Sequence, residues 1–389
     1  MPHDPLTQTE TATLVRLSDQ LTTALRAVID SSPLAGLGPI EAARTLGIDK
    51  TLASRLMTAL RAPDPLVALS SLPGVSPLRQ FVRAARLHGA DPRTVKAAEA
   101  ELSAFNAELQ RTYGTRTGLD AILADALPDT RRRQQEGARQ LVHRGMALLK
   151  GISIDLASVT WIVHPSRARP DRVDILVLAA FVGVRRLRPT ARVRFAASHS
   201  RTRPEEHARL VTPFCRPADL AISTTREGAL TVYEIATGPI RRDASSDVFL
   251  SETLPAATPL ASPAEGPDTF CLGDCIAHPY RRLALRMIIH ESAWPGCDFA
   301  LAAYDTSVRG APVRLPDPAR DADVLPLDAP ILRSRLTPDT LRSFPVPNYH
   351  AALEHLTAPL GWDLTGARMF TGEMAYPLYG SEVLFIHQR

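Results

Sequence analysis

Residues 40–60 read IEAARTLGIDKTLASRLMTAL, and this stretch predicts two short helices joined by a tight turn. Ala43 is small where the two helices would cross, and Gly47 supplies the positive φ that the turn needs. Asp49 is placed to cap the second helix. Four side chains that can donate hydrogen bonds then lie on the outward face of that helix: Lys50, Thr51, Ser54 and Arg55.

This stretch resembles the helix-turn-helix of winged-helix transcriptional regulators, first of the IclR type and next of the MarR type. The resemblance rests on the turn at residues 46–48 and on residues 51–60. It implies a DNA-binding domain whose groove-facing side chains are Lys50, Thr51, Ser54 and Arg55, with Arg44 and Arg61 near the DNA backbone. The next residues, 65–79, differ from the basic wing of these regulators, because they carry no charge before Arg79.

The composition is that of an ordinary globular protein, with 389 residues, 45% hydrophobic and 22% charged. The longest apolar run, residues 175–184, is shorter than the roughly 18 residues that span a bilayer. No secretory signal is recognisable at the N-terminus, and four cysteines do not make a disulfide framework. We therefore expect a cytoplasmic protein with no membrane partner.

The net charge of +4 is weak evidence for nucleic-acid binding, because only three of the 45 basic residues are lysines and the arginines are spread along the chain. One segment stands out. Arg185–Arg203 holds seven arginines and no acidic residue. It is either a surface that binds phosphate or an anionic effector, or a solvated face without a ligand.

Helical periodicity dominates up to about residue 150, and short strands with Pro-rich or Gly-rich turns follow. We predict an α+β protein with three regions: a winged-helix-like domain at 1–90, a helical linker or dimerisation region at 91–150, and a mixed, mainly antiparallel α+β domain at 151–389. The helix at 91–113 repeats apolar residues at heptad spacing, so it either packs on its own domain or pairs with a second copy. The predicted strands are 159–164, 173–184, 192–197, 229–235, 283–290, 299–304 and 383–387, and the loops richest in proline are 256–267 and 312–330.

Motifs for catalysis are missing from the sequence. There is no glycine-rich nucleotide loop, P-loop or G-x-S-x-G elbow. Cys271, Cys275, His278 and Cys297 do not have the spacing of common zinc sites, and the histidines of HAALEH at 350–355 lie too far apart around a helix to share an ion. We therefore assign no catalytic residue, no metal ligand and no cofactor.

The sequence thus favours a homodimeric transcriptional regulator that binds double-stranded DNA, with a C-terminal domain that senses a small-molecule effector or a partner. Two alternatives stay open. One is an enzyme, such as a small-molecule transferase, whose N-terminal domain only dimerises. The other is a protein-interaction module.

Overall fold

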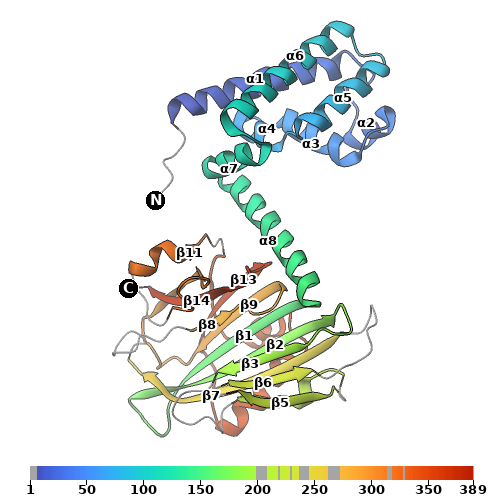
Figure 1. The fold of residues 1–389 in the computed structure, drawn as a ribbon. Coiled ribbons are helices and arrows are strands. Elements are labelled where there is room, and N and C mark those ends of the chain that lie inside the picture. Colours follow the sequence, from blue (N-terminus) through green and yellow to red (C-terminus); the bar gives the residue numbers. More distant parts are fainter. Residues whose placement is uncertain are drawn as a thin grey trace. The chain divides into compact units, whose positions relative to one another are not determined.

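The computed structural model describes residues 7–198, 208–217, 220–227, 230–235, 245–261, 272–312, 318–326 and 329–388 (Figure 1). The chain divides into two compact units, Met1–Gly137 and Ala138–Arg389. The first unit is helical and the second is built on β-sheets, so the chain has the mixed α+β class that the sequence predicts.

The helices up to the end of α8 follow one another with short connections. They are α1 (Gln8–Asp30), α2 (Pro39–Leu46), α3 (Lys50–Arg61), α4 (Pro65–Ser71), α5 (Val75–Leu87), α6 (Pro92–Glu108), α7 (Arg116–Ala126) and α8 (Pro128–Lys150), with a π-helical turn (Leu109–Tyr113) after α6. A capping box starts α1, because Thr7 and Glu10 each accept a hydrogen bond from the other's backbone N–H. The apolar faces of α1 to α7 meet in one core.

Two further helices replace the wing that the resemblance implies. Asp64 caps α4 by accepting the N–H groups of Leu66 and Val67 at 2.7 and 3.0 Å, and Pro65 takes the first helical position. Residues 7–151 are all described and contain no strand. This corrects the winged-helix-like expectation: the unit is helical throughout, because its prolines and caps start helices where a hairpin would lie.

The heptad stripe of α6 is used inside the first unit. Val95, Ala98, Leu102 and Phe105 are all buried, and α6 packs on α1 and α5. The structure therefore agrees with the interpretation in which this helix packs on its own domain. The apolar stripe is covered, so it cannot also pair with a second copy of the chain. Residues 92–126 therefore belong to the first unit, and the division between the units falls within α8.

Three sheets make up the second unit. The first has seven strands in the order β12-β13-β9-β1-β2-β7-β4, the second has the order β11-β10-β14-β8, and the third β3-β6-β5. The strands are β1 (Ile152–Pro165), β2 (Arg172–Arg186), β3 (Val193–Ser198), β4 (Ala208–Leu210), β5 (Ile222–Glu227), β6 (Leu230–Ile235), β7 (Ser246–Pro259), β8 (Leu272–Cys275), β9 (Tyr280–Ile289), β10 (Asp298–Asp305), β11 (Val324–Leu325), β12 (Leu332–Arg335), β13 (Arg368–Ala375) and β14 (Ser381–Gln388), and two helices follow β12, α9 (Pro338–Arg342) and α10 (Tyr349–Thr357).

The central strands of the seven-stranded sheet are buried on both faces. Its central strand β1 pairs in parallel with β9 and antiparallel with β2, and the other strand pairs among the described residues are antiparallel. Along β2, Ile175 and Phe181 join the core under the two smaller sheets, whereas Leu176 and Leu178 join the core under α10. The nearly continuous apolar run at 173–184 follows from this double burial.

Each predicted strand overlaps an observed one, but the predicted loop at 256–267 is wrong at its start. β7 continues to Pro259 and pairs with β2 through residues 172–173. Residues 262–267 of that segment and 313–317 and 327–328 of the segment 312–330 lie outside the described residues.

Candidate nucleic-acid interface

Helix α3 separates cleanly into an exposed polar face and a buried apolar face. At 100° per residue, the exposed positions cover one arc of about 140° around the helix. They are Lys50, Thr51, Ser54, Arg55, Thr58 and Arg61. The opposite positions, Leu52, Ala53, Leu56, Met57, Ala59 and Leu60, are buried in the first unit. No acidic residue lies within α3, so the exposed face carries only positive charge and neutral hydrogen-bonding groups.

The turn before α3 has the geometry that the sequence predicts. Gly47 adopts φ 66° and ψ 31°, and its N–H and that of Ile48 both donate to Ala43 O. Ala43 is 6% exposed, so its small side chain lies inside the crossing of α2 and α3. Asp49 then caps α3, with its Oδ1 accepting the Thr51 N–H at 2.7 Å. Hydrogen bonds from Thr51 lower the pKa of Asp49.

All six side chains predicted for DNA binding are exposed. Lys50, Thr51, Ser54, Arg55 and Arg61 share the open arc of α3, and Arg44 lies in the last turn of α2. Arg55 Nη2 also donates to Leu72 O, at 3.4 Å. This long bond holds the guanidinium beside the C-terminus of α4 while the side chain stays exposed.

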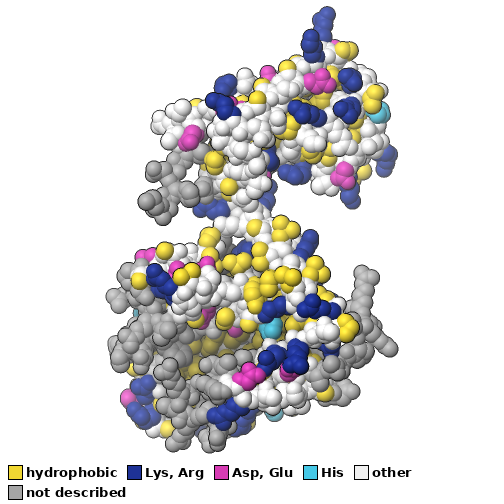
Figure 2. Space-filling model, viewed as in Figure 1, with side chains coloured by type: hydrophobic (Ala, Val, Ile, Leu, Met, Phe, Trp, Pro, Cys, Tyr) yellow, Lys and Arg dark blue, Asp and Glu magenta, His cyan; other side chains and the backbone are white. Residues whose placement is uncertain are grey.

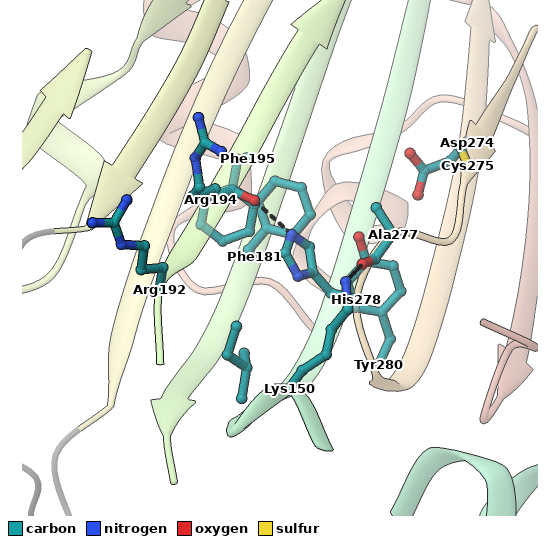
Figure 3. A pocket seen from close by; sticks show the side chains of 11 residues that line it. Lys150, Phe181, Arg192, Arg194, Phe195, Asp274, Cys275, Ala277, His278 and Tyr280 are labelled. Carbon is teal, nitrogen blue, oxygen red and sulfur yellow. Dashed lines mark hydrogen bonds between the residues drawn. The ribbon is translucent and has the colours of Figure 1, made fainter. Parts of the chain in front are cut away.

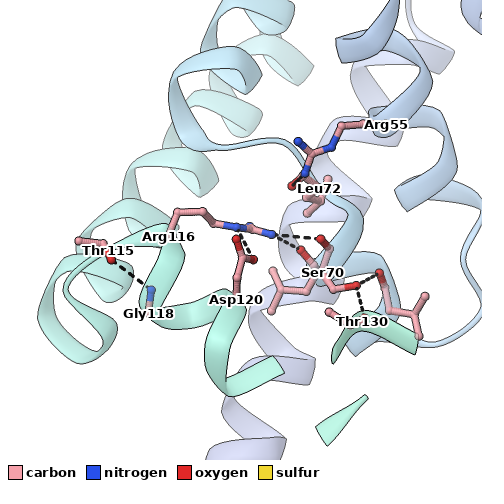
Figure 4. A network of polar contacts seen from close by, with 10 residues as sticks. Arg55, Ser70, Leu72, Thr115, Arg116, Gly118, Asp120 and Thr130 are labelled. Atoms are coloured by element: carbon pink, nitrogen blue, oxygen red, sulfur yellow. Dashed lines mark hydrogen bonds and ion pairs between the residues drawn. The ribbon is translucent and has the colours of Figure 1, made fainter. Parts of the chain in front are cut away.

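Two arginines that sequence reasoning missed link the helices around this site, Arg26 to α3 and Arg116 to α4. Arg26 of α1 donates through Nε to Leu60 O at 3.2 Å, at the C-terminal end of α3. Arg116 of α7 donates to Asp120 Oδ1 and Leu69 O, at 2.9 and 2.8 Å (Figure 4). Desolvation lowers the pKa of Arg116. Figure 4 shows Arg55 pointing into the same region from α3, so α3, α4 and α7 meet at one polar cluster.

The basic segment Arg185–Arg203 forms many ion pairs and backbone contacts within the second unit. Arg185 pairs with Asp155, Arg188 donates to Leu149 O, and Arg194 pairs with Glu227 and Glu234. Arg192 lies 3.7 Å from Glu234 and is largely exposed. Residues 201 and 203 of this segment lie outside the described residues. Three of the segment's seven arginines therefore form ion pairs within the unit, and Figure 2 shows Lys and Arg side chains spread over both units.

Within the described ranges, no group of three or more His, Cys, Asp or Glu side chains could hold an ion. Cys275 is exposed, Cys215 and Cys297 are buried, and Cys271 lies outside those ranges.

Comparisons with known proteins add little to this geometry. No family model matches the chain, and no curated protein does. A solved structure with detectable similarity is a two-domain M1 zinc metallopeptidase mutant bound to L-tryptophan, at 8% identity and a TM-score of 0.27. The match covers 60% of this chain and 42% of that one, so the chain spans less than half of that protein. A similarity this low carries no argument. Among the described residues, no helix has both the length and the apolar character to cross a membrane.

Proposed function

We propose that the chain is a transcriptional regulator that binds double-stranded DNA by placing α3 in the major groove. The observation that carries this proposal is the division of α3 into a buried apolar half and an exposed half without acidic residues. A packing module would have little need for a helix whose whole outer arc consists of Lys, Arg, Ser and Thr.

The side chains on the arc match the two kinds of contact that duplex binding needs. Arg55 can donate two parallel hydrogen bonds to a guanine edge, and Thr51 and Ser54 can bond to base edges or phosphates. Lys50 and Arg61 at the two ends of α3, with Arg44 on α2, are placed for phosphates along the groove. The major groove, about 12 Å wide, admits one helix.

The proposal includes a homodimer. An exposed apolar stripe on α8 supports this part of the proposal. Leu141 and Leu148 are 68% and 73% exposed, and Val142 and Leu149 are exposed beside them. Leu141 and Leu148 are seven residues apart, and so are Val142 and Leu149. This is the spacing that lets two helices pack along a common seam. Figure 2 shows hydrophobic side chains gathered over this part of α8. Two-fold symmetry would place the DNA half-sites about 34 Å apart.

Selection of bound duplexes from a randomised pool, using the full chain, tests the proposal. The selected duplex is then titrated at increasing salt by fluorescence anisotropy. We expect affinity to fall steeply with salt, because each phosphate contact releases counterions. Lys50→Ala should lower the salt slope by about 1, whereas Arg55→Ala should cost about 1 to 3 kcal/mol of discrimination at one base position.

Arg342→Ala is the matched control, since this arginine is also exposed but lies on α9 in the second unit. It should leave both the slope and the selectivity unchanged. If no duplex is enriched, or if binding is insensitive to salt and to Arg55→Ala, then α3 has another role and the proposal fails.

A further inference from the structure

A cavity of about 510 Å³ opens in the second unit, between the end of α8 and strands β1, β2, β3, β8 and β9 (Figure 3). It is lined by Lys150, Ile152, Phe181, Arg192, Arg194, Phe195, Asp274, Cys275, Ala277, His278 and Tyr280. Its volume lies within the range of about 300 to 1,000 Å³ that holds drug-sized ligands. Nothing in the DNA-binding proposal uses these residues.

The cavity lining includes three cationic side chains. Arg194 lies in β3, and Arg192 directly precedes that strand, two residues from Arg194. Arg192 keeps a 76% exposed side chain with an ion pair to Glu234 at 3.7 Å, which leaves most of its five donors available. Lys150 Nζ donates one hydrogen bond, to Ala277 O at 3.0 Å, and has two further donors. These groups can bind a carboxylate or a phosphate.

The wall beside these cations is aromatic. Phe181 and Phe195 stack with their ring centroids 4.2 Å apart, and Tyr280 lies 6.1 Å from Phe181. All three rings are at most 7% exposed. Because aromatic rings pack favourably edge to face as well as face to face, this apolar wall fits an aromatic ring of the ligand.

The tautomer of His278 adds a specific requirement. Its Nε2 lies 2.7 Å from Arg194 O, and since a carbonyl oxygen only accepts, Nε2 must carry the proton. Burial lowers the pKa of His278 to about 4, so the ring is neutral at pH 7 and its Nδ1 is a bare acceptor. Nδ1 is buried and has no hydrogen-bond partner within the described part of the chain, and the residue is 8% exposed.

Asp274 supplies a second unsatisfied polar group to the same lining. Its Oδ2 is also buried without a hydrogen-bond partner among the described residues. Figure 3 shows Asp274 apart from Arg192 and Arg194, with the His278 ring between them, and the Lys150 amine beside Ala277. The two arginines and the unsatisfied Asp274 oxygen therefore lie on opposite sides of His278.

We propose that this cavity binds a small ligand in which a planar ring joins an oxyanion to an N–H or O–H donor. The oxyanion, a carboxylate or a phosphate, is held by Arg192. The ring packs against the wall that Phe181, Phe195 and Tyr280 form, and the donor satisfies His278 Nδ1. Burying two polar atoms without partners is costly, so a ligand that supplies the missing hydrogen is favoured over one that does not.

Calorimetric titration of the full chain with a matched set of ligands tests this proposal. We expect 6-hydroxy-2-naphthoate to bind, its 6-methoxy ether to bind about tenfold more weakly because the donor is lost, and its carboxamide to bind about tenfold more weakly because the charge is lost. The affinity of adenosine monophosphate is compared with that of adenosine to test a phosphate in place of the carboxylate. Whichever anion binds more tightly identifies the source of the oxyanion.

Variants of the protein give an independent measurement. Arg192→Gln should weaken the anionic ligand about tenfold, while Arg342→Gln, an equally exposed arginine elsewhere in the unit, should not. His278→Gln keeps a donor for Arg194 O and an acceptor for the ligand, so it should bind nearly as well as the native chain, whereas His278→Phe should not. The ligand series needs no variant, so misfolding of His278→Phe would not hide the answer.

Three results would overturn the proposal. They are binding of the methoxy ether or the carboxamide as tight as that of the parent acid, unchanged binding by Arg192→Gln, and no binding of either anion tighter than about 1 mM. These titrations contain no DNA, so their outcome is separate from the outcome of the duplex selection.

Discussion

Replacing Gly47 with alanine should destabilise the chain, although the new methyl group would touch nothing. Gly47 has φ +66°, and a Cβ built there meets no atom within 4 Å. The cost is therefore conformational, because an L-residue in the left-handed region is unfavourable by about 1 to 2 kcal/mol. Part of this is offset by the lower entropy of the unfolded chain, about 0.4 to 1 kcal/mol. We expect a net loss of about 1 kcal/mol.

Replacing Gly137 with alanine should instead increase the free energy of unfolding. Gly137 lies within α8, has no positive φ, and a Cβ there also meets nothing within 4 Å. Alanine is favoured over glycine in a helix interior by about 0.8 to 1 kcal/mol. Gly47→Asn completes the set, since asparagine tolerates the left-handed region and should lose less than alanine does.

Urea denaturation, followed by circular dichroism at 222 nm, gives the free energy of unfolding of each variant from its midpoint and slope. The helical signal is appropriate because both glycines lie in the first unit, Met1–Gly137. If Gly47→Ala stabilises the chain as much as Gly137→Ala does, then the turn between α2 and α3 does not have the left-handed geometry, and the crossing that presents α3 is wrong.

Three further predictions concern the second unit. Burial raises the pKa of Asp274 to about 7, so the folded chain binds a proton that the unfolded chain releases, and stability should fall as pH rises from about 4 to 7. Asp274→Asn should therefore raise Tm at pH 8 but change it little at pH 4. Arg286 is fully buried with its guanidinium 3.7 Å above the Phe344 ring, and Arg286→Ala should cost about 3 kcal/mol in urea denaturation through the lost cation–π contact and the cavity. Replacing both Leu141 and Leu148 with Glu should convert the proposed dimer to a monomer, read as a halved mass in light scattering.

Each of these has a result that contradicts it. A Tm difference for Asp274→Asn that is the same at pH 4 and pH 8 would mean that the carboxyl titrates normally. A loss below 1 kcal/mol for Arg286→Ala would mean that the arginine is not needed to hold residues 344–349 against the sheet. A native chain that is monomeric at all concentrations would remove the role given to α8, and Leu87→Glu, at another exposed leucine, is the control for that experiment.

Local patterns explain why much of the fold was predictable. The alternation of apolar and polar residues at 40–61 depends only on helical periodicity, so it correctly indicated which face of α3 is exposed. Likewise Gly47 could be identified because a tight turn between helices needs a positive φ. The strand at 173–184 was recognisable because burial on both faces leaves a continuous apolar run.

Strand β7 was not predicted, and its prolines are tolerated for a reason that the sequence does not contain. Pro255 lies just beyond Leu254, where the pairing of β7 with β2 changes register between Val173 and Ile175. On its other side, the pairs that β7 makes with β4 among the described residues are at 250–252 and do not include a proline. The register shift beside Pro255 is visible only in the assembled sheet.

The cavity could not be assembled from the sequence, because its lining comes from six helices and strands and from the segments between them. Phe181, Arg194 and His278 are brought together by the way the strands of different sheets lie against one another. The one available signal was the alternation of Arg192 and Arg194 on a predicted strand. It identified a shared face but not the histidine or the aromatic rings beside that face.

The junction between α8 and β1 makes occupancy of the cavity observable from outside it. Gly151, at φ 68°, is the single residue between the helix and the strand, and its two neighbours, Lys150 and Ile152, both line the cavity. A spin label on the exposed Leu149 would therefore sit one position from a group that holds the occupant. The spectrum of the label would show reduced motion of the C-terminal end of α8 when a ligand binds in the cavity. A probe at this position would therefore report ligand binding without any knowledge of the DNA sequence that the protein binds.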